Sequence, residues 1–358
     1  MEINITRVAP EKMKSKPVNE DKLGFGKLFS DHFFIMEYDN EKGWHNAFIE
    51  PYRPLSLDPS AMCFHYGQEI FEGMKAYRGK DDSVYLFRPE ENIKRMNISA
   101  KRLCMPEIDS HLFMEGMQKL VILEKDWIPH STGTSLYIRP TMIATEKSLG
   151  VHPSSEYIFY IIVGPVGAYY PEGFSPTKIH VSEELVRSVR GGVGFCKAAG
   201  NYAASLYASE EASKLGYTQV LWLDALEMKY AEEVGTSNIF FLIGDELITP
   251  PLSGSILSGV TRDSVIRLAE HWGIKVSERP LSMDKILDAC SDGTLKDCFA
   301  SGTAAIVSPV GQIYYKGREH VINEGRTGEL TEKLYNEILQ IQYGKKEDPF
   351  GWRVKISD

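Results

Sequence analysis

The amino-acid sequence predicts an α+β protein built from two domains, for three reasons. The chain has 358 residues, which is long for a single hydrophobic core. Candidate strands and helices interleave irregularly, without the regular alternation of a parallel α/β sheet. The segment 164–176, GPVGAYYPEGFSP, is dense in glycine, proline and tyrosine, as expected for a link between domains. We therefore expect an N-terminal domain over 1–165, a linker over 166–176 and a C-terminal domain over 177–358.

In the N-terminal half, apolar and aromatic runs predict strands, and two periodic segments predict helices. Residues 1–22 are polar and mixed in charge, and they are expected to form a loose arm. The helix over 89–103 has a proline and two glutamates in its first turn and apolar residues on one broad face. The predicted elements are strands over 28–38, 44–54, 73–77, 84–87, 135–145 and 157–164, and helices over 89–103 and 111–127.

In the C-terminal half, helix boundaries are marked by ordinary start and stop signals. Gly273 ends the helix over 261–272, and Ser282 is the N-cap of the helix over 282–290. Residues 230–235 lead into a strand over 237–243. The predicted elements are strands over 178–181, 219–224, 237–243 and 275–278, and helices over 201–214, 261–272, 282–290 and 330–343.

Composition excludes several classes of protein. The net charge of −9, from 40 basic and 49 acidic residues, argues against a nucleic-acid partner. No apolar run is long enough to cross a membrane, and the N-terminus has no features of a signal or transit peptide, so we expect a cytoplasmic protein. The five cysteines lack CxxC spacing and suit reduced thiols, and the nine histidines form no HExxH motif, so no metal site is expected.

The stretch GGVGFCKAAGNY over 191–202 places one lysine, Lys197, between a glycine-rich approach and small residues. Glycines let a ligand approach the backbone, and lysine is the side chain that forms Schiff bases. We therefore expect Lys197 to hold pyridoxal phosphate (PLP) through a Schiff base. The local sequence is equally compatible with a solvated lysine on a loop, so other segments have to supply the remaining parts of a cofactor site.

A PLP site also needs a phosphate cup, an acid at the pyridine nitrogen and a partner for the phenolate oxygen. Two turns of small and hydroxyl residues, 258–261 and 301–304, suit the cup, the first because it opens a helix. Arg95 is a candidate guanidinium for the phosphate. The alternative for Arg95 is a place on a solvated helix face. The alternative for the segments 258–261 and 301–304 is that they are ordinary turns without a bound phosphate.

Glu233 lies just before a strand and is a candidate acid, with Glu232 as its rival. Alternation along a strand turns one of these two carboxylates towards solvent. Tyr202 is a candidate partner for the phenolate oxygen, with a core aromatic as the alternative. No other motif competes, because the sequence has no third glycine at dinucleotide spacing, no P-loop and no GxSxG elbow.

Ten motifs follow one another along the chain: FHYGQEIFEGMKAY (64–77), LFRPEENIKRM (86–96), LYIRP (136–140), SLGV (148–151), GPVGAYY (164–170), GGVGFCKAAGNYAASL (191–206), QVLWLD (219–224), EEVGTSNIFF (232–241), LSGVTRDS (257–264) and SGTAAIVSPV (301–310). In these motifs and their order the sequence resembles the branched-chain amino-acid aminotransferases, which are PLP enzymes of fold type IV. The resemblance implies a small N-terminal α/β domain and a larger C-terminal domain with a barrel-like sheet.

The resemblance also implies roles for individual residues. Lys197 would be the Schiff-base lysine and proton shuttle, Glu233 would bind the pyridine nitrogen, and Tyr202 would contact the phenolate oxygen. The residues implied for the phosphate and the ring are Arg95, Val260, Thr261 and Thr303, with Thr236 close to the ring and Arg187 on the phosphate side. Those implied for the substrate pocket are Phe25, Tyr66, Tyr137, Arg139, Tyr169 and the turn Thr303–Ala304, with Leu149 and Val151 reaching the neighbouring subunit's site in a homodimer.

The function implied by the resemblance is a reversible ping-pong transfer of the amino group from L-leucine, L-isoleucine or L-valine to 2-oxoglutarate. An aromatic, apolar pocket suits the branched side chains, and Arg139 suits the carboxylate of glutamate. A D-amino-acid transaminase, an aminodeoxychorismate lyase and a non-catalytic binding protein are the alternatives. Some relatives carry a CxxC pair after the Gly-Thr-Ala turn; here Ala305 and Ser308 take those positions, so no thiol switch is expected.

Overall fold

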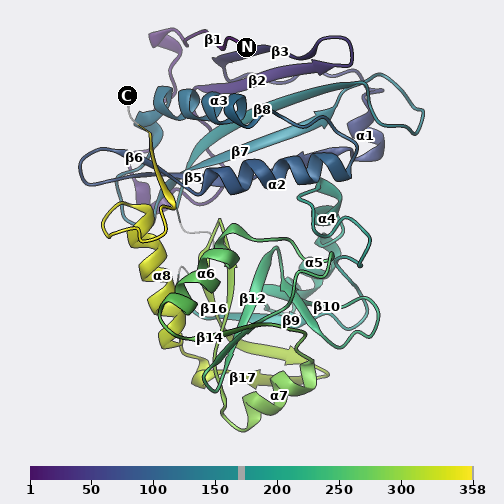
Figure 1. Cartoon of the computed structure of the whole chain (residues 1–358), viewed down its shortest axis with the longest axis vertical. Helices are drawn as coiled ribbons and strands as arrows, with labels where there is room; N and C mark the ends of the chain where they lie inside the picture. Colours follow the sequence, from purple (N-terminus) through teal and green to yellow (C-terminus); the bar gives the residue numbers. More distant parts are fainter. Residues whose placement is uncertain (168–173, 357–358) are drawn as a thin grey trace. The chain divides into compact units, whose positions relative to one another are not determined.

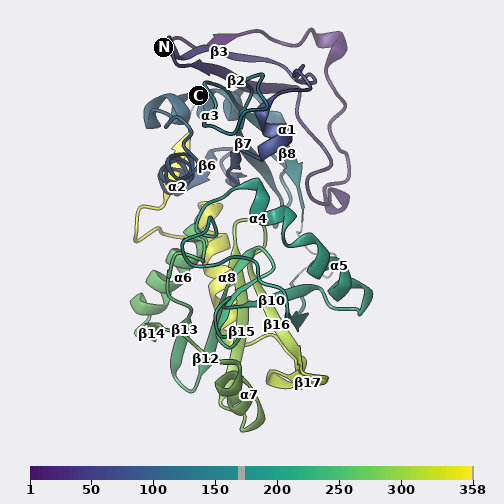
Figure 2. The same cartoon turned by 90° about the vertical axis from the view of Figure 1, so that its right-hand side faces the viewer.

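The computed structural model describes residues 1–167 and 174–356 and divides into two compact units, each with its own β-sheet (Figures 1 and 2). The first unit comprises the chain up to residue 167, residues 196–199 and the C-terminal residues from Leu339. The second comprises residues 174–195 and 200–338. The domain boundaries expected from the sequence remain a prediction, and part of the expected linker lies outside the described residues.

The sheet of the first unit has the strand order β1-β3-β2-β8-β7-β5-β6-β18, and β4 pairs with β7. Only the pairing of β1 with β3 is parallel among these described strands. The strands are β1 (Asn4–Ile5), β2 (His32–Asp39), β3 (Gly43–Pro51), β4 (Glu69–Phe71), β5 (Met74–Arg78), β6 (Val84–Phe87), β7 (Ser135–Ala144), β8 (Glu156–Val166) and β18 (Arg353–Ile356). The helices are α1 (Met62–Tyr66), α2 (Pro89–Arg102) and α3 (Ser110–Leu123).

Helices α2 and α3 lie along one face of this sheet and enclose the core of the first unit (Figure 1). Their apolar stripes meet the alternating apolar residues of the strands, as the periodicity predicts. The approach is close at Gly116 of α3, where an added Cβ would lie 2.8 Å from the Phe34 ring. A larger residue at 116 would therefore push the helix away from the sheet.

The expectation of a loose N-terminal arm is wrong, because hydrogen bonds hold the arm against the first sheet. The amide of Val8 donates to Nε2 of His32 at 2.8 Å, and the amide of Lys14 donates to Asp31 Oδ1 at 2.8 Å. The carboxylate of Glu20 accepts bonds from the backbone amides of residues 130 and 131 at 2.7–3.0 Å. Sequence polarity could not reveal these bonds, because their partners are far away in the chain.

The sheet of the second unit follows the order β11-β10-β9-β16-β15-β12-β13-β14, with β17 beside β16. An additional pairing of β11 with β12 closes six of these strands into a barrel, so the expected barrel-like sheet is confirmed. The strands are β9 (Thr177–Val181), β10 (Gln219–Leu223), β11 (Ala231–Val234), β12 (Ser237–Ile243), β13 (Glu246–Thr249), β14 (Lys275–Glu278), β15 (Leu295–Gly302), β16 (Ile306–Tyr315) and β17 (Arg318–Val321). The helices are α4 (Ala199–Ala203), α5 (Leu206–Lys214), α6 (Val260–His271), α7 (Met283–Ser291) and α8 (Glu329–Gln342).

The single helix expected over 201–214 is divided into α4 and α5. The hydroxyl of Ser205 donates to the carbonyl of Tyr202 at 2.7 Å, and that of Ser209 donates to the carbonyl of Ser205 at 2.9 Å. Serine hydroxyls that bond to nearby backbone groups compete with helix continuation. The break therefore has a local chemical cause that apolar periodicity does not register.

Candidate active site

The backbone around Lys197 is fixed by α2 and the β4 region of the first unit. The Lys197 amide donates to the hydroxyl of Ser99 at 3.0 Å, and its carbonyl accepts from the amide of Phe71 at 3.0 Å. Ala198 forms an isolated bridge with Ile70. These bonds exclude a free surface loop for Lys197. Cys196 is buried, and burial raises the pKa of its thiol, as expected for a packing residue.

Several of the pocket residues expected from the sequence lie around the Phe71 ring in the first unit. The amine of Lys197 lies 4.9 Å from the centroid of the Phe71 ring, and the guanidinium of Arg139 lies 4.7 Å from it. Arg139 Nη2 donates to the Tyr137 hydroxyl at 3.0 Å, and the Phe25 ring lies 4.8 Å from that of Tyr137. The Nε of Arg139 is buried without a hydrogen-bond partner among the described residues. Sequence reasoning missed Phe71, because a phenylalanine within an apolar motif carries no distinguishing signal.

Arg95 is buried and forms an ion pair with Glu72, so the alternative of a solvated helix face is wrong. Its Nε lies 2.7 Å from Glu72 Oε1 and its Nη2 lies 2.9 Å from Oε2, while Asn92 donates to Oε2 at 2.9 Å. Burial acts to raise the pKa of Glu72, but Arg95 and these hydrogen bonds outweigh it and the pKa is lowered. Glu72 therefore remains ionised and holds the guanidinium in one orientation.

Replacing Arg95 by methionine is expected to destabilise the protein by about 3–5 kcal/mol, because the buried Glu72 carboxylate loses its counter-ion. The double variant Glu72→Gln/Arg95→Met should recover part of this loss. Chemical denaturation of the variants measures both effects. The exposed pair Glu115–Lys119, 2.7 Å apart on α3, is the control, since its removal should cost at most about 0.5 kcal/mol. Equal effects at the two pairs would contradict the structural role of Arg95.

Lys75 is a buried lysine on β5, directly opposite Tyr137 of β7. Paired residues of antiparallel strands face the same side, so Lys75 shares the sheet face of Tyr137 and Arg139. The neighbours Met74 and Ala76 belong to the core on the other face. Burial lowers the pKa of Lys75 to about 7. Much of the Lys75 population is therefore neutral near pH 7.

Lys75→Met is expected to stabilise the protein at pH 7 by a few kcal/mol, with a benefit that shrinks as the pH rises towards 10. The unfolded chain keeps this lysine protonated up to about pH 10.4, whereas the folded chain releases the proton near 7. Stability of the wild type therefore rises through this window by about 1.4 kcal/mol per pH unit from this group alone. Melting temperatures across the range test this, with the exposed Lys80→Met as control. A benefit independent of pH would contradict it.

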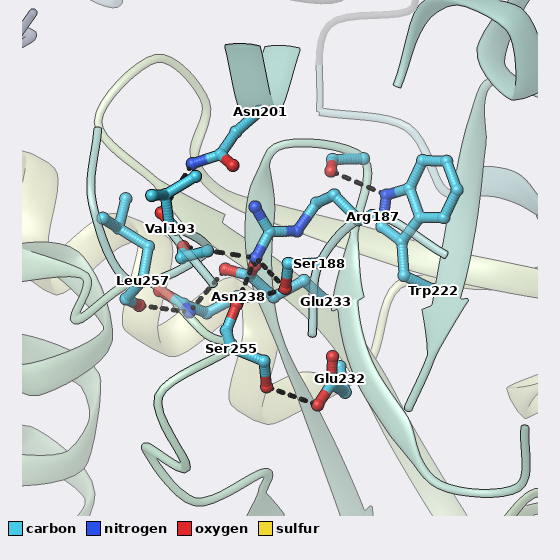
Figure 3. A network of polar contacts seen from close by, with 12 residues as sticks. Arg187, Ser188, Val193, Asn201, Trp222, Glu232, Glu233, Asn238, Ser255 and Leu257 are labelled. Atoms are coloured by element: carbon cyan, nitrogen blue, oxygen red, sulfur yellow. Dashed lines mark hydrogen bonds and ion pairs between the residues drawn. The ribbon is translucent and has the colours of Figure 1, made fainter. Parts of the chain in front are cut away.

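In the second unit, Glu233 lies at the centre of a buried polar network (Figure 3). The guanidinium of Arg187 forms an ion pair with Glu233 Oε2, and its Nη2 also donates to the carbonyl of Ser255 at 2.5 Å. Asn238 donates to Glu233 Oε1 at 3.2 Å. The structure thus places Arg187 on the acid, whereas the resemblance implied the phosphate side. Asn238 was not among the residues expected from the sequence.

Glu232 occupies the opposite face of β11, as strand alternation predicts. It is only half-buried, yet it does not simply point into solvent, because Ser255 donates its hydroxyl to Glu232 Oε1 at 2.5 Å (Figure 3). Burial raises the pKa of Glu232. The residue also lines a largely apolar cavity of about 180 Å³. The two neighbouring carboxylates therefore have distinct surroundings.

The expected phosphate residues of the second unit lie at turns and at a helix start. Val260 and Thr261 open α6, where backbone amides have no partner within the helix. The N-cap is Gly259, which offers no side-chain cap. Thr303 and Ala304 lie in the hairpin turn between β15 and β16. Thr236 is exposed in the turn between β11 and β12. Gly235, the residue before it, has a positive φ of +56°.

The glycine-rich approach to Lys197 packs closely against protein. A Cβ on Gly194 would lie 2.3 Å from the carbonyl oxygen of Ser255 and 2.4 Å from the hydroxyl of Ser188. Both serines belong to the network around Glu233. Within the second unit the close approach at Gly194 is to the two serines that support Glu233, whereas approach of a ligand to these glycines stays a prediction.

The other expected site residues have varied surroundings. Tyr202 is half-buried on α4, while Tyr66 is exposed and donates its hydroxyl to the carbonyl of Leu149. Leu149 and Val151 are exposed by 66% and 85%. Tyr169 lies outside the described residues. Within 1–167 and 174–356, no helix is long and apolar enough to span a membrane, and no cluster of three His, Cys, Asp or Glu residues suits a metal.

Comparison with known proteins places these features in one family. Residues 69–313 match the model of the amino-transferase class IV family. Branched-chain-amino-acid aminotransferase 2 of Bacillus subtilis (strain 168) is 53% identical over 344 residues, which cover 96% of this chain and 94% of the relative. The branched-chain amino acid aminotransferase of Escherichia coli has a TM-score of 0.74 and 27% identity over 92% of this chain and 99% of its own.

The structure of a third relative contains a phosphopyridoxyl compound. The T.th. branched-chain amino acid aminotransferase, in complex with N-(5'-phosphopyridoxyl)-L-glutamate, has a TM-score of 0.73 and 25% identity over 90% of this chain and 98% of its own. The fold and the family match define a PLP-dependent aminotransferase of class IV. The chain belongs to the family of the branched-chain-amino-acid aminotransferases.

The described residues fit PLP. The hydroxyl of Ser301, next to the turn with Thr303, is buried without a hydrogen-bond partner among them, and α6 begins without a side-chain cap. Glu233 is a buried carboxylate that Arg187 pairs with, which favours its ionised form. These features suit the phosphate group and the pyridine nitrogen of PLP.

Proposed function

We propose that this protein transfers the amino group of L-leucine, L-isoleucine or L-valine to 2-oxoglutarate, giving a branched 2-oxo acid and L-glutamate. The observation that carries the proposal is the group around Phe71, where the Lys197 amine and the Arg139 guanidinium approach the same ring. This group combines a reactive amine with an apolar wall and a cation. Such a combination suits an enzyme that binds a substrate with a branched apolar side chain in one half-reaction and one with an acidic side chain in the other.

We further propose roles for individual side chains at the cofactor. PLP, when bound, provides the electron sink for the substrate's α-carbon. Lys197 would hold the cofactor covalently, and its Nζ would carry the α-proton as general base and acid. Glu233 would keep the pyridine nitrogen protonated. The remaining cofactor residues are Tyr202 at the phenolate oxygen, Thr236 near the ring, and Arg95, Val260, Thr261 and Thr303 at the phosphate.

The proposed pocket has to accept two kinds of side chain. Phe25, Phe71 and Tyr137 offer aromatic area to leucine, isoleucine or valine. The buried Nε of Arg139 lacks a partner among the described residues and suits the distal carboxylate of glutamate. The other proposed substrate residues are Tyr66, Tyr169, Thr303 and Ala304.

We propose a cytoplasmic homodimer as the active form. Phe64 on α1 is an exposed apolar residue, and so are Leu149 and Val151 in the loop that Tyr66 of α1 contacts through the carbonyl of Leu149. In a dimer Leu149 and Val151 would complete the pocket of the neighbouring subunit. Val151→Asp should weaken the dimer in sedimentation and lower activity in proportion.

The test of the proposed activity is a panel of amino donors with 2-oxoglutarate as acceptor, read by formation of the 2-oxo acid. L-leucine, L-isoleucine and L-valine should all react, and L-leucine should give 4-methyl-2-oxopentanoate. Activity on D-alanine without activity on L-leucine would instead assign a D-amino-acid transaminase. Release of pyruvate from aminodeoxychorismate would assign the lyase.

A further inference from the structure

Asn238 links two parts of the proposed cofactor site in the second unit. Its side-chain amide donates to Glu233 Oε1 at 3.2 Å and to the carbonyl of Leu257 at 2.9 Å (Figure 3). Leu257 lies in the turn that leads into α6. Asn238 is itself only 5% exposed. One buried amide therefore contacts both the acid and the segment that precedes the proposed phosphate residues.

The oxygen of the same Asn238 amide packs against the N-cap of α6. A Cβ added to Gly259 would lie only 2.1 Å from Asn238 Oδ1, so glycine is required for this approach. Gly259 directly precedes Val260, the first residue of the helix. The position of Asn238 thus fixes where the helix begins relative to β12.

Strand register explains why Asn238 can make both contacts. It lies directly opposite Glu233 on β11 and opposite Ser301 on β15. Directly paired residues face the same side of a sheet, so the three side chains form a polar row across three strands. Ser301 Oγ, at the end of this row, is buried and has no hydrogen-bond partner among the described residues. The row therefore joins the acid to the turn that carries Thr303.

We propose that Asn238 is a positioning residue that couples the Glu233 carboxylate to the phosphate-binding start of α6, an inference that rests on the proposed function. Its N–H donor favours an ionised Glu233 and fixes the direction of the carboxylate. Its contacts with Leu257 and Gly259 hold the helix start in register with that carboxylate. Loss of the side chain should therefore impair both cofactor retention and the ring's protonation.

The experiment compares Asn238→Ala and Asn238→Asp with wild-type holoenzyme. Asn238→Ala should speed the release of PLP by about 10-fold, as expected for loss of a buried hydrogen bond, and should shift the pH titration of the visible cofactor band. Asn238→Asp places a second carboxylate beside Glu233, so its band should shift further and its kcat should partly recover as the pH is lowered. KM for L-leucine should change less than kcat in both variants.

The matched control is Thr249→Val, which removes another buried hydrogen bond of the same sheet, from Thr249 Oγ1 to the carbonyl of Ile239 at 2.8 Å. It should leave PLP release and the titration unchanged even if the melting temperature falls. Gly259→Ala should repeat the faster PLP release through the second contact alone. If Asn238→Ala behaves like Thr249→Val, the inference is wrong. If the wild type binds no PLP, the proposed function itself fails.

Discussion

Replacing Lys197 by alanine is expected to lower transamination between L-leucine and 2-oxoglutarate by at least about 10⁴-fold. In the roles proposed for Lys197, the variant loses both the covalent attachment of the cofactor and the base that moves the α-proton. The protein should still fold, because the backbone of residue 197 makes the bonds to Ser99 and Phe71, and alanine retains them. Initial rates and the visible absorption of the purified protein measure the two losses together.

Lys80→Ala, which removes an exposed lysine of the first unit, is the control for the loss of a positive charge. It should keep both the visible band and the full rate. A Lys197→Ala protein that retained more than a few per cent of the activity would show that another amine performs the reaction. Added alkylamines should restore part of the rate if the proton transfer assigned to Lys197 is correct.

Glu233→Gln is expected to lower kcat on the order of 10²- to 10³-fold while bound PLP is retained. Glutamine has nearly the same shape, and its one side-chain oxygen can still accept from Arg187, while its amide nitrogen replaces the oxygen that accepts from Asn238. The strand β11 should therefore remain in place with one hydrogen bond of the network lost. A neutral amide does not keep the pyridine nitrogen protonated, and the ring then withdraws electrons less strongly. Single-turnover rates and the absorption spectrum separate the chemical effect from loss of cofactor.

Glu232→Gln provides a control one residue away on the opposite face of the same strand. Its carboxylate bonds to Ser255 and faces the cavity beside β11, so the variant should retain nearly the full rate. Equal losses at the two positions would point to damage to β11 rather than to a role for Glu233. An unchanged rate for Glu233→Gln would contradict the role proposed for Glu233 in protonating the pyridine nitrogen.

Local patterns predicted most of the secondary structure. The strand over 84–87 and the helix over 89–103 were predicted almost to the residue, because their turn, cap and periodic signals lie within a few positions. Elements without such signals were missed. The strand β16 (Ile306–Tyr315) contains serine, proline and glycine, and it is formed by pairing with β15 and β9 rather than by its own sequence.

The family could be predicted from the sequence alone, because ordered motifs preserve residue identity and spacing, and the same motifs single out Lys197 and Glu233 as the candidate lysine and acid. Only the tertiary structure decided which groups meet: Glu72 with Arg95, Arg187 with Glu233, and Lys197 and Arg139 with Phe71. It also fixed the N-terminal arm and revealed Asn238. The physical reason is that hydrogen bonds and ion pairs depend on distance in space, and strand register brings together residues whose separation along the chain carries no such information.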